Sequence, residues 1–352
     1  MSITRASSNM STTTKNSISC FLKYRHLKPF LFVSPGRSFV AIPGTHLKSE
    51  KTKNAGWFGY FSYDGAKCWK YCSRVFEFKD LGDYNGEFEL KNFRPGLSRK
   101  KYAEKIGEIK KLLREGETYQ VNFAQEFKGD FSGDPLAFFC EMYKRNPAEM
   151  SFYYEEDDFA ICSNSPERLV SLRDGVLRSE PIKGTVGAGE DPENLLRSEK
   201  AYAELTMIVD LMRNDLAKIS VPGSVVVKKH QALMKQANVW HTYSVIESRL
   251  AAPVEAILPA LFPGGSVTGC PKKRTMEIID KLENFKRGVY CGSAGYILDS
   301  GEADFNIMIR TGVVSDGRLS FPAGGGILID SNADEEYDET LKKAAVVSGL
   351  TK

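Results

Sequence analysis

The stretch "DFNIMIRTGVVSDGRLSFPAGGGILI" (residues 304–329) contains two apolar runs joined at Asp316-Gly317, a dipeptide that favours a two-residue β-hairpin turn. A third strand-like run, "RGVYCGSAGYILD" (287–299), precedes it and leads into Ser300-Gly301. Strands joined by such short turns pair antiparallel, because a parallel connection needs a crossover of a dozen or more residues. The stretch therefore predicts three consecutive antiparallel strands.

Helices interleave with further strand blocks along the rest of the chain. Ser98 resembles an N-cap for a helix that Gly116 ends, and a last helix is predicted from about Asn332. Residues 192–218 predict a long amphipathic helix, because Leu205, Ile208, Val209, Met212 and Leu216 recur on one face. There is no regular alternation of strand and helix. The fold class is therefore α+β with large antiparallel sheets, not a doubly wound parallel sheet.

Composition limits the classes of partner. The 352 residues carry 48 basic and 45 acidic side chains spread along the chain, so we expect no nucleic-acid binding. No apolar run approaches the roughly 20 residues that span a bilayer, so we expect no membrane association. The seven scattered cysteines form no CxxC pair, which favours a reducing cytoplasm. The Ser/Thr-rich N-terminus leaves an organelle-targeting segment as the alternative.

The chain divides into three parts. Residues 1–20 are expected to be a disordered tail, because they are polar and rich in Ser and Thr. Residues 21–95 alternate short apolar runs with Gly, Pro, Asn and Asp, which predicts a β-rich N-terminal part. Residues 96–352 hold the remaining helices and strands and every motif considered below.

Two glycine-rich stretches suggest close approach of the backbone to a ligand. "PGGSVTGCPKKRT" (263–275) has the glycine spacing of a P-loop, but Cys270 stands where that motif needs Lys, so the P-loop reading fails. What remains is a loop that enters a helix and offers free N–H groups to an anion, or a plain turn. "PAGGGI" (322–327) indicates either ligand contact or a tight sheet crossing.

Several charged residues allow a functional and a structural interpretation. Glu336 and Glu339 share a helix face in "DEEYDET", where they could bind Mg²⁺ with Glu204 or simply face solvent. His241 in "VWHTYS" is either a hydrogen-bonded structural residue or a catalyst. Lys183 in "EPIKGTVG" is a solvated surface group, unless desolvation makes it a nucleophile.

Nine ordered segments between about 115 and 346 resemble the chorismate-utilising enzymes, the family of the anthranilate, aminodeoxychorismate, isochorismate and salicylate synthases. They read "EGETYQVNFAQEF", "SPERLV", "PIKGT", "AELTMIVDLMRNDLAK", "VWHTYS", "FPGGSVTGCPKKRTMEIID", "CGSAGYI", "FNIMIRT" and "AGGGILIDSNADEEYDET". The resemblance implies a single large domain of two packed, mostly antiparallel β-sheets surrounded by helices.

The residue between "PI" and "GT" separates activities within this family. Anthranilate and isochorismate synthases usually carry Ala there, whereas aminodeoxychorismate synthases carry a nucleophilic Lys, which is Lys183 here. The resemblance thus implies that Lys183 adds to chorismate while Glu167 protonates the departing hydroxyl, and that ammonia then displaces the lysine. A dry pocket would favour both a neutral Lys183 and a protonated Glu167. Anthranilate synthase or isochorismate/salicylate synthase activity, and a non-catalytic subunit that binds a dicarboxylate, are the alternatives.

The resemblance also implies the remaining site residues. Glu204, Glu336 and Glu339 match the family's Mg²⁺ carboxylates, and His241 matches a catalytic pocket position. The implied substrate contacts are Gly184, Thr185, Thr268, Gly269, Tyr296, Arg310, Gly324, Gly325, Gly326 and Lys343. Ala201 departs from the pattern, because anthranilate synthases often have a further Glu there.

The implied partners are chorismate and a separate glutamine amidotransferase subunit that supplies ammonia. No cysteine of the chain lies in a nucleophile elbow of its own, which favours such a subunit or free ammonia. The segment before residue 100 is shorter than in full-length relatives, so their N-terminal tryptophan site is not carried over.

Overall fold

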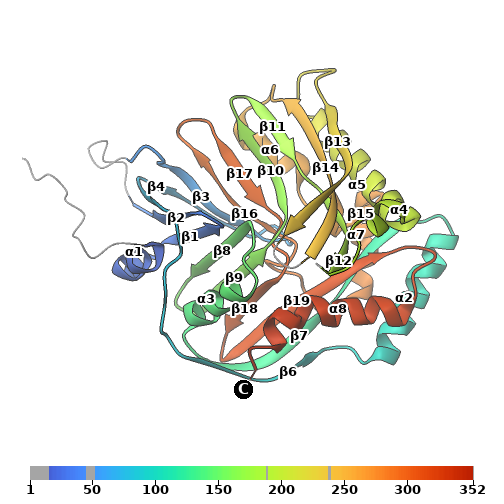
Figure 1. Cartoon of the computed structure of the whole chain (residues 1–352), viewed down its shortest axis with the longest axis horizontal. Coiled ribbons are helices and arrows are strands. Elements are labelled where there is room, and N and C mark those ends of the chain that lie inside the picture. Colours follow the sequence, from blue (N-terminus) through green and yellow to red (C-terminus); the bar gives the residue numbers. More distant parts are fainter. Residues whose placement is uncertain (1–15, 45–51, 188, 237–238, 352) are drawn as a thin grey trace, which may run out of the picture.

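The structure, a computed structural model, describes residues 16–44, 52–187, 189–236 and 239–351. Two large β-sheets form its centre, and every strand pair within them is antiparallel (Figure 1). The α+β prediction with mostly antiparallel sheets is confirmed.

The first sheet has ten strands, in the order β15-β7-β19-β18-β9-β8-β1-β2-β5 with β6 also paired to β7. Their bounds are β1 Phe30–Ser34, β2 Arg37–Ile42, β5 Arg74–Phe78, β6 Phe88–Pro95, β7 Gln120–Gly133, β8 Met150–Glu155, β9 Phe159–Ser165, β15 Gly269–Cys270, β18 Thr311–Ser315 and β19 Arg318–Ile327.

The second sheet has nine strands, in the order β12-β14-β11-β10-β17-β16-β3-β4 with β13 also paired to β14. Their bounds are β3 Gly56–Phe61, β4 Lys67–Cys72, β10 Arg168–Arg173, β11 Val176–Ser179, β12 Ile182–Gly187, β13 Val226–Gln236, β14 Val239–Arg249, β16 Ser293–Leu298 and β17 Ala303–Asn306.

Helices cover the outer faces of the two sheets (Figure 1). Their bounds are α1 Ser17–Tyr24, α2 Arg99–Arg114, α3 Pro135–Arg145, α4 Glu193–Arg197, α5 Glu199–Ala217, α6 Ile257–Leu261, α7 Lys272–Leu282 and α8 Ala333–Ser348. None of those in the described ranges combines the length and apolarity needed to cross a bilayer.

Four apolar clusters among the described residues hold these layers together; one packs α2 and α7 against the first sheet, and the other three build the stack. One packs α1, α3 and α8 against the first sheet, and another packs α5 and α6 against the second. The third joins the two sheets: the Phe32 ring lies 5.9 Å from both Phe58 and Tyr296, whose strands belong to the second sheet. The molecule is therefore a four-layer stack, helices outside and sheets inside.

The structure corrects several expectations from the sequence. Residues 17–20 are not part of a disordered tail, because they form the start of α1, where Ile18 and Cys20 are buried; residues 1–15 lie outside the described residues. The helix predicted over 192–218 breaks at Ser198, which caps α5. The described strands within residues 21–95 pair within both sheets.

Residues 304–329 also contain a break that the sequence pattern did not reveal. Residues 304–314 are two strands, not one: β17 ends at Asn306 in the second sheet and β18 begins at Thr311 in the first. The four residues between them cross from one sheet to the other, and Arg310 takes a left-handed φ of 49° at the end of that crossing. Such bends are how a chain passes between packed sheets.

Candidate active site

A cavity of about 1190 Å³ opens where the two sheets meet α5 and α8. Its lining includes most of the residues selected from the sequence: Glu167, Lys183, Gly184, Glu204, His241, Arg310, Gly324, Gly325, Gly326, Glu336, Glu339 and Lys343. Thr185 follows Gly184 in β12. The structure thus brings into one cavity residues that are up to 176 positions apart (343 − 167).

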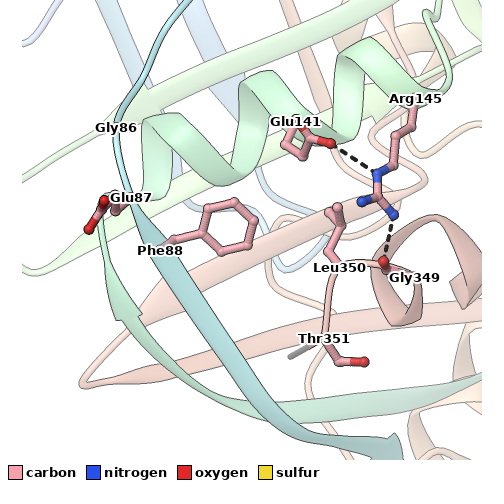
Figure 2. Close-up of a pocket in the computed structure, with 8 residues that line it drawn as sticks. All are labelled: Gly86, Glu87, Phe88, Glu141, Arg145, Gly349, Leu350 and Thr351. Carbon is pink, nitrogen blue, oxygen red and sulfur yellow. Dashed lines mark hydrogen bonds and ion pairs between the residues drawn. The ribbon is translucent and has the colours of Figure 1, made fainter.

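A second hollow of about 430 Å³ lies beside residues Gly349 to Thr351 (Figure 2). In Figure 2, Arg145 reaches from α3 to hydrogen-bond Glu141 and the Gly349 carbonyl. Arg145 lines both hollows, but none of the predicted site residues lines this one. The predicted site residues therefore gather in the larger cavity.

Glu167 lies where the chain passes from β9 in the first sheet to β10 in the second. This crossing runs beside the one after β17: the Ile307 N–H donates to the Glu167 carbonyl (3.0 Å), and the Ser165 hydroxyl donates to the Ile307 carbonyl (2.5 Å). Paired crossings fix two side chains at the same opening between the sheets. They are Glu167 and Arg310, both of which line the cavity.

A β-bulge places Lys183 at the other side of the cavity. β12 loses register with β14 between Lys183 and Thr185, and Gly184, between them, has a φ of 68°. Bulges often re-aim a side chain beside an active site, and glycine adopts this φ without strain. A Cβ on Gly184 would also lie 3.1 Å from Leu195. The glycine of "PIKGT" is thus explained by backbone geometry.

The Ser266 carbonyl holds the Lys183 amine in place. Lys183 Nζ donates to it at 3.2 Å, and Asn122 Nδ2 donates to it at 3.1 Å. The Ser266 hydroxyl lies close enough to Glu167 to influence that carboxyl, although it makes no hydrogen bond of standard geometry within the described chain. Lys183 and Glu167 therefore meet around one residue.

The electrostatics at Glu167 favour the protonated acid. Its side chain is 6% exposed, and this burial raises the pKa of the carboxyl above its ordinary value. The charges of Lys183 and Lys343 and the Ser266 hydroxyl oppose that rise but do not cancel it. A carboxyl kept neutral by burial can donate a proton near neutral pH.

Arg310 is a largely buried cation at the cavity wall. Burial lowers the pKa of its guanidinium, and within the described ranges its side chain makes no hydrogen bond or ion pair. Burial of a charge is costly unless the charge is paired. An anionic ligand would supply the missing partner, so this arginine suits a carboxylate.

Two of the three proposed metal carboxylates converge on Gly325. Glu339 Oε1 and Glu336 Oε2 lie 3.2 and 3.3 Å from the point that a Cβ on Gly325 would occupy, so only glycine leaves this space open. Mg²⁺ is commonly held by one or two carboxylates together with water and substrate, and this pair fits that requirement. Glu204 lines the cavity from α5, but no three acidic, His or Cys side chains among the described residues form one metal-binding group.

Lys343 and His241 make defined contacts beside this pair. Lys343 Nζ lies 2.6 Å from Glu339 Oε1 and donates to the Gly324 carbonyl at 2.7 Å. His241 Nδ1 lies 3.2 Å from the Gly184 carbonyl, and burial lowers the pKa of this imidazole. A neutral His241 that donates to Gly184 supports the bulge next to Lys183.

The structure does not place three of the selected residues at the cavity. Thr268 is fully buried and donates to the Gly264 carbonyl at 3.0 Å, and Gly269 pairs with Val121 in the first sheet. Tyr296 packs among Phe32, Phe39 and Phe58 in the cluster between the sheets. These contacts are structural, and none of the three lines the cavity.

Sequence reasoning missed Asn122, Ser266 and the ion pair behind them. Glu283 and Arg287 are joined at 2.7 Å with both side chains 2% exposed. Arg287 also donates to the Val267 carbonyl at 2.8 Å and the Asn122 carbonyl at 2.7 Å. Arg287 thus fixes the backbone at Val267, which follows Ser266, and at Asn122, whose side chain donates to the Ser266 carbonyl. The i, i+4 spacing of the ion pair is visible in the sequence, but its complete burial is not.

We expect Glu283→Gln to destabilise the fold by about 3 kcal/mol, because it leaves the Arg287 charge buried without its counter-charge. Urea unfolding followed by circular dichroism measures this change. The matched control is Asp280→Asn, which removes an exposed ion pair to Lys286 and should leave the unfolding midpoint unchanged. Equal midpoints for both variants would contradict the structural role of the buried pair.

Comparison with known proteins agrees with this geometry. The chain is 43% identical over 260 residues to aminodeoxychorismate synthase component 1 of Klebsiella aerogenes, covering 71% of this chain and 58% of that protein. It is 38% identical over 267 residues to anthranilate synthase component 1 of Saccharolobus solfataricus, covering 73% and 63%. The chain thus spans less than two thirds of the length of these relatives.

Solved structures give the same fold. The crystal structure of anthranilate synthase component I from Streptococcus pneumoniae superposes with a TM-score of 0.73 at 27% identity, covering 90% of this chain and 89% of that one. A putative 2,3-dihydroxybenzoate-specific isochorismate synthase from Bacillus anthracis gives a TM-score of 0.81 at 20% identity, covering 95% and 99%, and supports the fold alone. The sequence profile of the chorismate binding enzymes matches residues 69–349, most of the chain, and the protein therefore belongs to that family.

Proposed function

We propose that this protein converts chorismate and ammonia into 4-amino-4-deoxychorismate, as the synthase component of an aminodeoxychorismate synthase. The observation that carries the proposal is the meeting of the Lys183 amine and the buried Glu167 carboxyl, whose pKa burial raises, at Ser266 in one cavity. A site that only binds a dicarboxylate needs neither a nucleophile nor an acid. Relatives of the same name, at 43% and 40% identity, support it.

In the proposed reaction, the Lys183 amine bonds to C2 of the ring, the ring double bonds shift, and the C4 hydroxyl leaves with the proton of Glu167 as water. Ammonia then bonds to C4, the double bonds shift back, and the C2–Nζ bond breaks to restore Lys183. The Glu167 carboxylate takes the extra proton from the new ammonium group. Two displacements replace one difficult step, which is the advantage of covalent catalysis.

The remaining cavity residues would bind and orient the substrate. Arg310 would pair with one chorismate carboxylate, and Glu336 and Glu339, with Glu204 from α5, would hold Mg²⁺ near Gly325. When bound, the ion would counter the charge of the second carboxylate. Ammonia would come from a glutamine amidotransferase partner, because the relatives are named component 1. All seven cysteines are free thiols, which suits a reducing compartment such as the cytoplasm.

The test is product identification. The chain is incubated with chorismate, MgCl₂ and an ammonium salt, and the products are separated by chromatography. We expect 4-amino-4-deoxychorismate, formed only when ammonium is present. Anthranilate as the product, or isochorismate formed without ammonium, would assign the protein to another activity of the family.

Arg310→Met is expected to weaken chorismate binding about 10- to 100-fold, because a charge-assisted hydrogen bond to a carboxylate is lost. Calorimetric titration of the variant with chorismate in the absence of ammonia measures the dissociation constant. Arg213→Met is the matched control, since Arg213 is half-exposed and pairs only with Asp210 at 2.8 Å among the described residues. Unchanged binding by the Arg310 variant would remove this residue from the substrate contacts.

Glu336→Gln is expected to weaken divalent-cation binding at least about tenfold, because one of the two convergent carboxylates loses its charge. Mn²⁺ titration followed by electron paramagnetic resonance detects the bound ion without a turnover assay. Asp334 lies on the same helix as Glu336 and makes an exposed ion pair with Arg99 of α2. Asp334→Asn should therefore retain the affinity of the unmodified protein. Equal Mn²⁺ affinity in the two variants would place the cation elsewhere.

A further inference from the structure

We infer that Asn122 and Ser266 form the subsite that binds the incoming ammonia molecule. Both side chains line the cavity, and both are more than nine-tenths buried, with 7% and 5% of their surfaces exposed. Asn122 Oδ1 and Ser266 Oγ nevertheless have no hydrogen bond of standard geometry within the described chain, and Glu167 is near enough to Ser266 to be influenced by its hydroxyl. Buried polar atoms without partners are rare and costly, so two of them in one cavity point to a ligand.

The position of these atoms connects them to the reacting groups. Asn122 Nδ2 and Lys183 Nζ donate to the same acceptor, the Ser266 carbonyl, at 3.1 and 3.2 Å. The Asn122 amide and the Lys183 amine therefore meet at the same carbonyl oxygen. The Ser266 hydroxyl lies close enough to the Glu167 carboxyl to oppose the rise in its pKa. A ligand held by both atoms would therefore lie near the amine and the acid of the proposed reaction.

The chemistry of the two atoms selects the ligand. An amide oxygen can only accept hydrogen bonds, and a serine oxygen can accept while its own hydrogen turns toward Glu167. Chorismate carboxylates have no hydrogen to donate, and the C4 hydroxyl, which can donate, has left as water before ammonia bonds to the ring. Ammonia has three N–H donors and one lone pair, so acceptors can hold its hydrogens and leave the lone pair directed at carbon. The inference rests on the proposed function, in which ammonia bonds to C4 and gives its extra proton to the Glu167 carboxylate.

The backbone around the subsite is held independently of any ligand. Arg287 donates to the Asn122 carbonyl, and the Asn122 N–H donates to the Thr268 carbonyl at 2.8 Å. Asn122 and Thr268 make these contacts with main-chain atoms alone. The contacts therefore persist when the Ser266 side chain is truncated. Ser266→Ala therefore removes one ammonia acceptor and keeps the carbonyl that positions Lys183.

The experiment separates the two half-reactions in the full chain. Without ammonia, Ser266→Ala should bind chorismate and form the Lys183 adduct at rates within about twofold of the unmodified protein, as read by intact-protein mass. At saturating chorismate and fixed pH, its KM for ammonium chloride should rise about 3- to 10-fold, the loss of one hydrogen bond. Ser248→Ala is the control, since Ser248 is equally buried but accepts from Ser220 away from the cavity.

Asn122→Asp provides a second variant, because it keeps an oxygen acceptor but loses the donor to Ser266. It should retain the KM for ammonium within about threefold of the unmodified protein while its kcat falls. An unchanged KM for ammonium in Ser266→Ala, or an equal loss in adduct formation, would overturn the subsite. If the unmodified protein formed adduct but a different product, the proposed function would fail first, and the ammonia subsite with it.

Discussion

Lys183→Ala is expected to lower the rate of 4-amino-4-deoxychorismate formation by at least about a thousandfold, because it removes the proposed nucleophile of the covalent step. The cavity retains Glu167, Arg310 and the convergent carboxylates in this variant. Chorismate binding should therefore change by less than about threefold, the size of one weak contact. Chromatographic assay of aminodeoxychorismate, anthranilate and isochorismate measures every alternative product in the same sample.

The matched control is Lys286→Ala, since Lys286 is 78% exposed and pairs with Asp280 outside the cavity. This variant should keep the full rate. Retention of more than about a tenth of the activity by Lys183→Ala would mean that the amine is not the nucleophile, even if the product is aminodeoxychorismate.

Glu167→Gln is expected to lower the same rate by about 10²- to 10⁴-fold, the usual contribution of a general acid. Glutamine keeps the shape of the side chain but cannot transfer a proton to the departing hydroxyl. Steady-state rates at saturating substrate measure the loss. The Lys183 adduct should also form more slowly in this variant, because the hydroxyl leaves in the step that forms it.

The pH dependence gives an independent signature of the same residue. Burial raises the pKa of Glu167, so its active, protonated form persists to a higher pH than an ordinary glutamic acid would allow. Activity should fall as the pH rises through this raised pKa, and Glu167→Gln should lack that alkaline decline. If the activity of Glu167→Gln declined at alkaline pH as in the unmodified protein, another group would be responsible for that decline.

Local patterns predicted the elements but not their assembly. The α2 and α8 caps at Ser98 and Asn332 and the hairpin at Asp316-Gly317 were readable, because capping and turn chemistry act over a few residues. The break at 307–310 was not readable, because an apolar run looks the same whether it stays in one sheet or crosses to another. The fold class followed from the turns, and the second sheet from the family resemblance.

The residues of the candidate site were likewise predicted only in part. Motif resemblance selected Lys183, Glu167 and Arg310, and the structure places all three at one cavity. It also selected Thr268 and Tyr296, which do not line the cavity. Asn122 and Ser266 were missed, since their importance lies in buried atoms without partners, which only three-dimensional packing reveals.

Intact-protein and peptide mass spectrometry after incubation with chorismate and Mg²⁺, without ammonia, tests the central claim most directly. The account predicts a chain that gains the mass of chorismate less one water, located on the peptide that contains Lys183, and loses it when ammonium is added. Product formation at full rate with no added mass on that peptide under any quench condition would contradict covalent catalysis by Lys183.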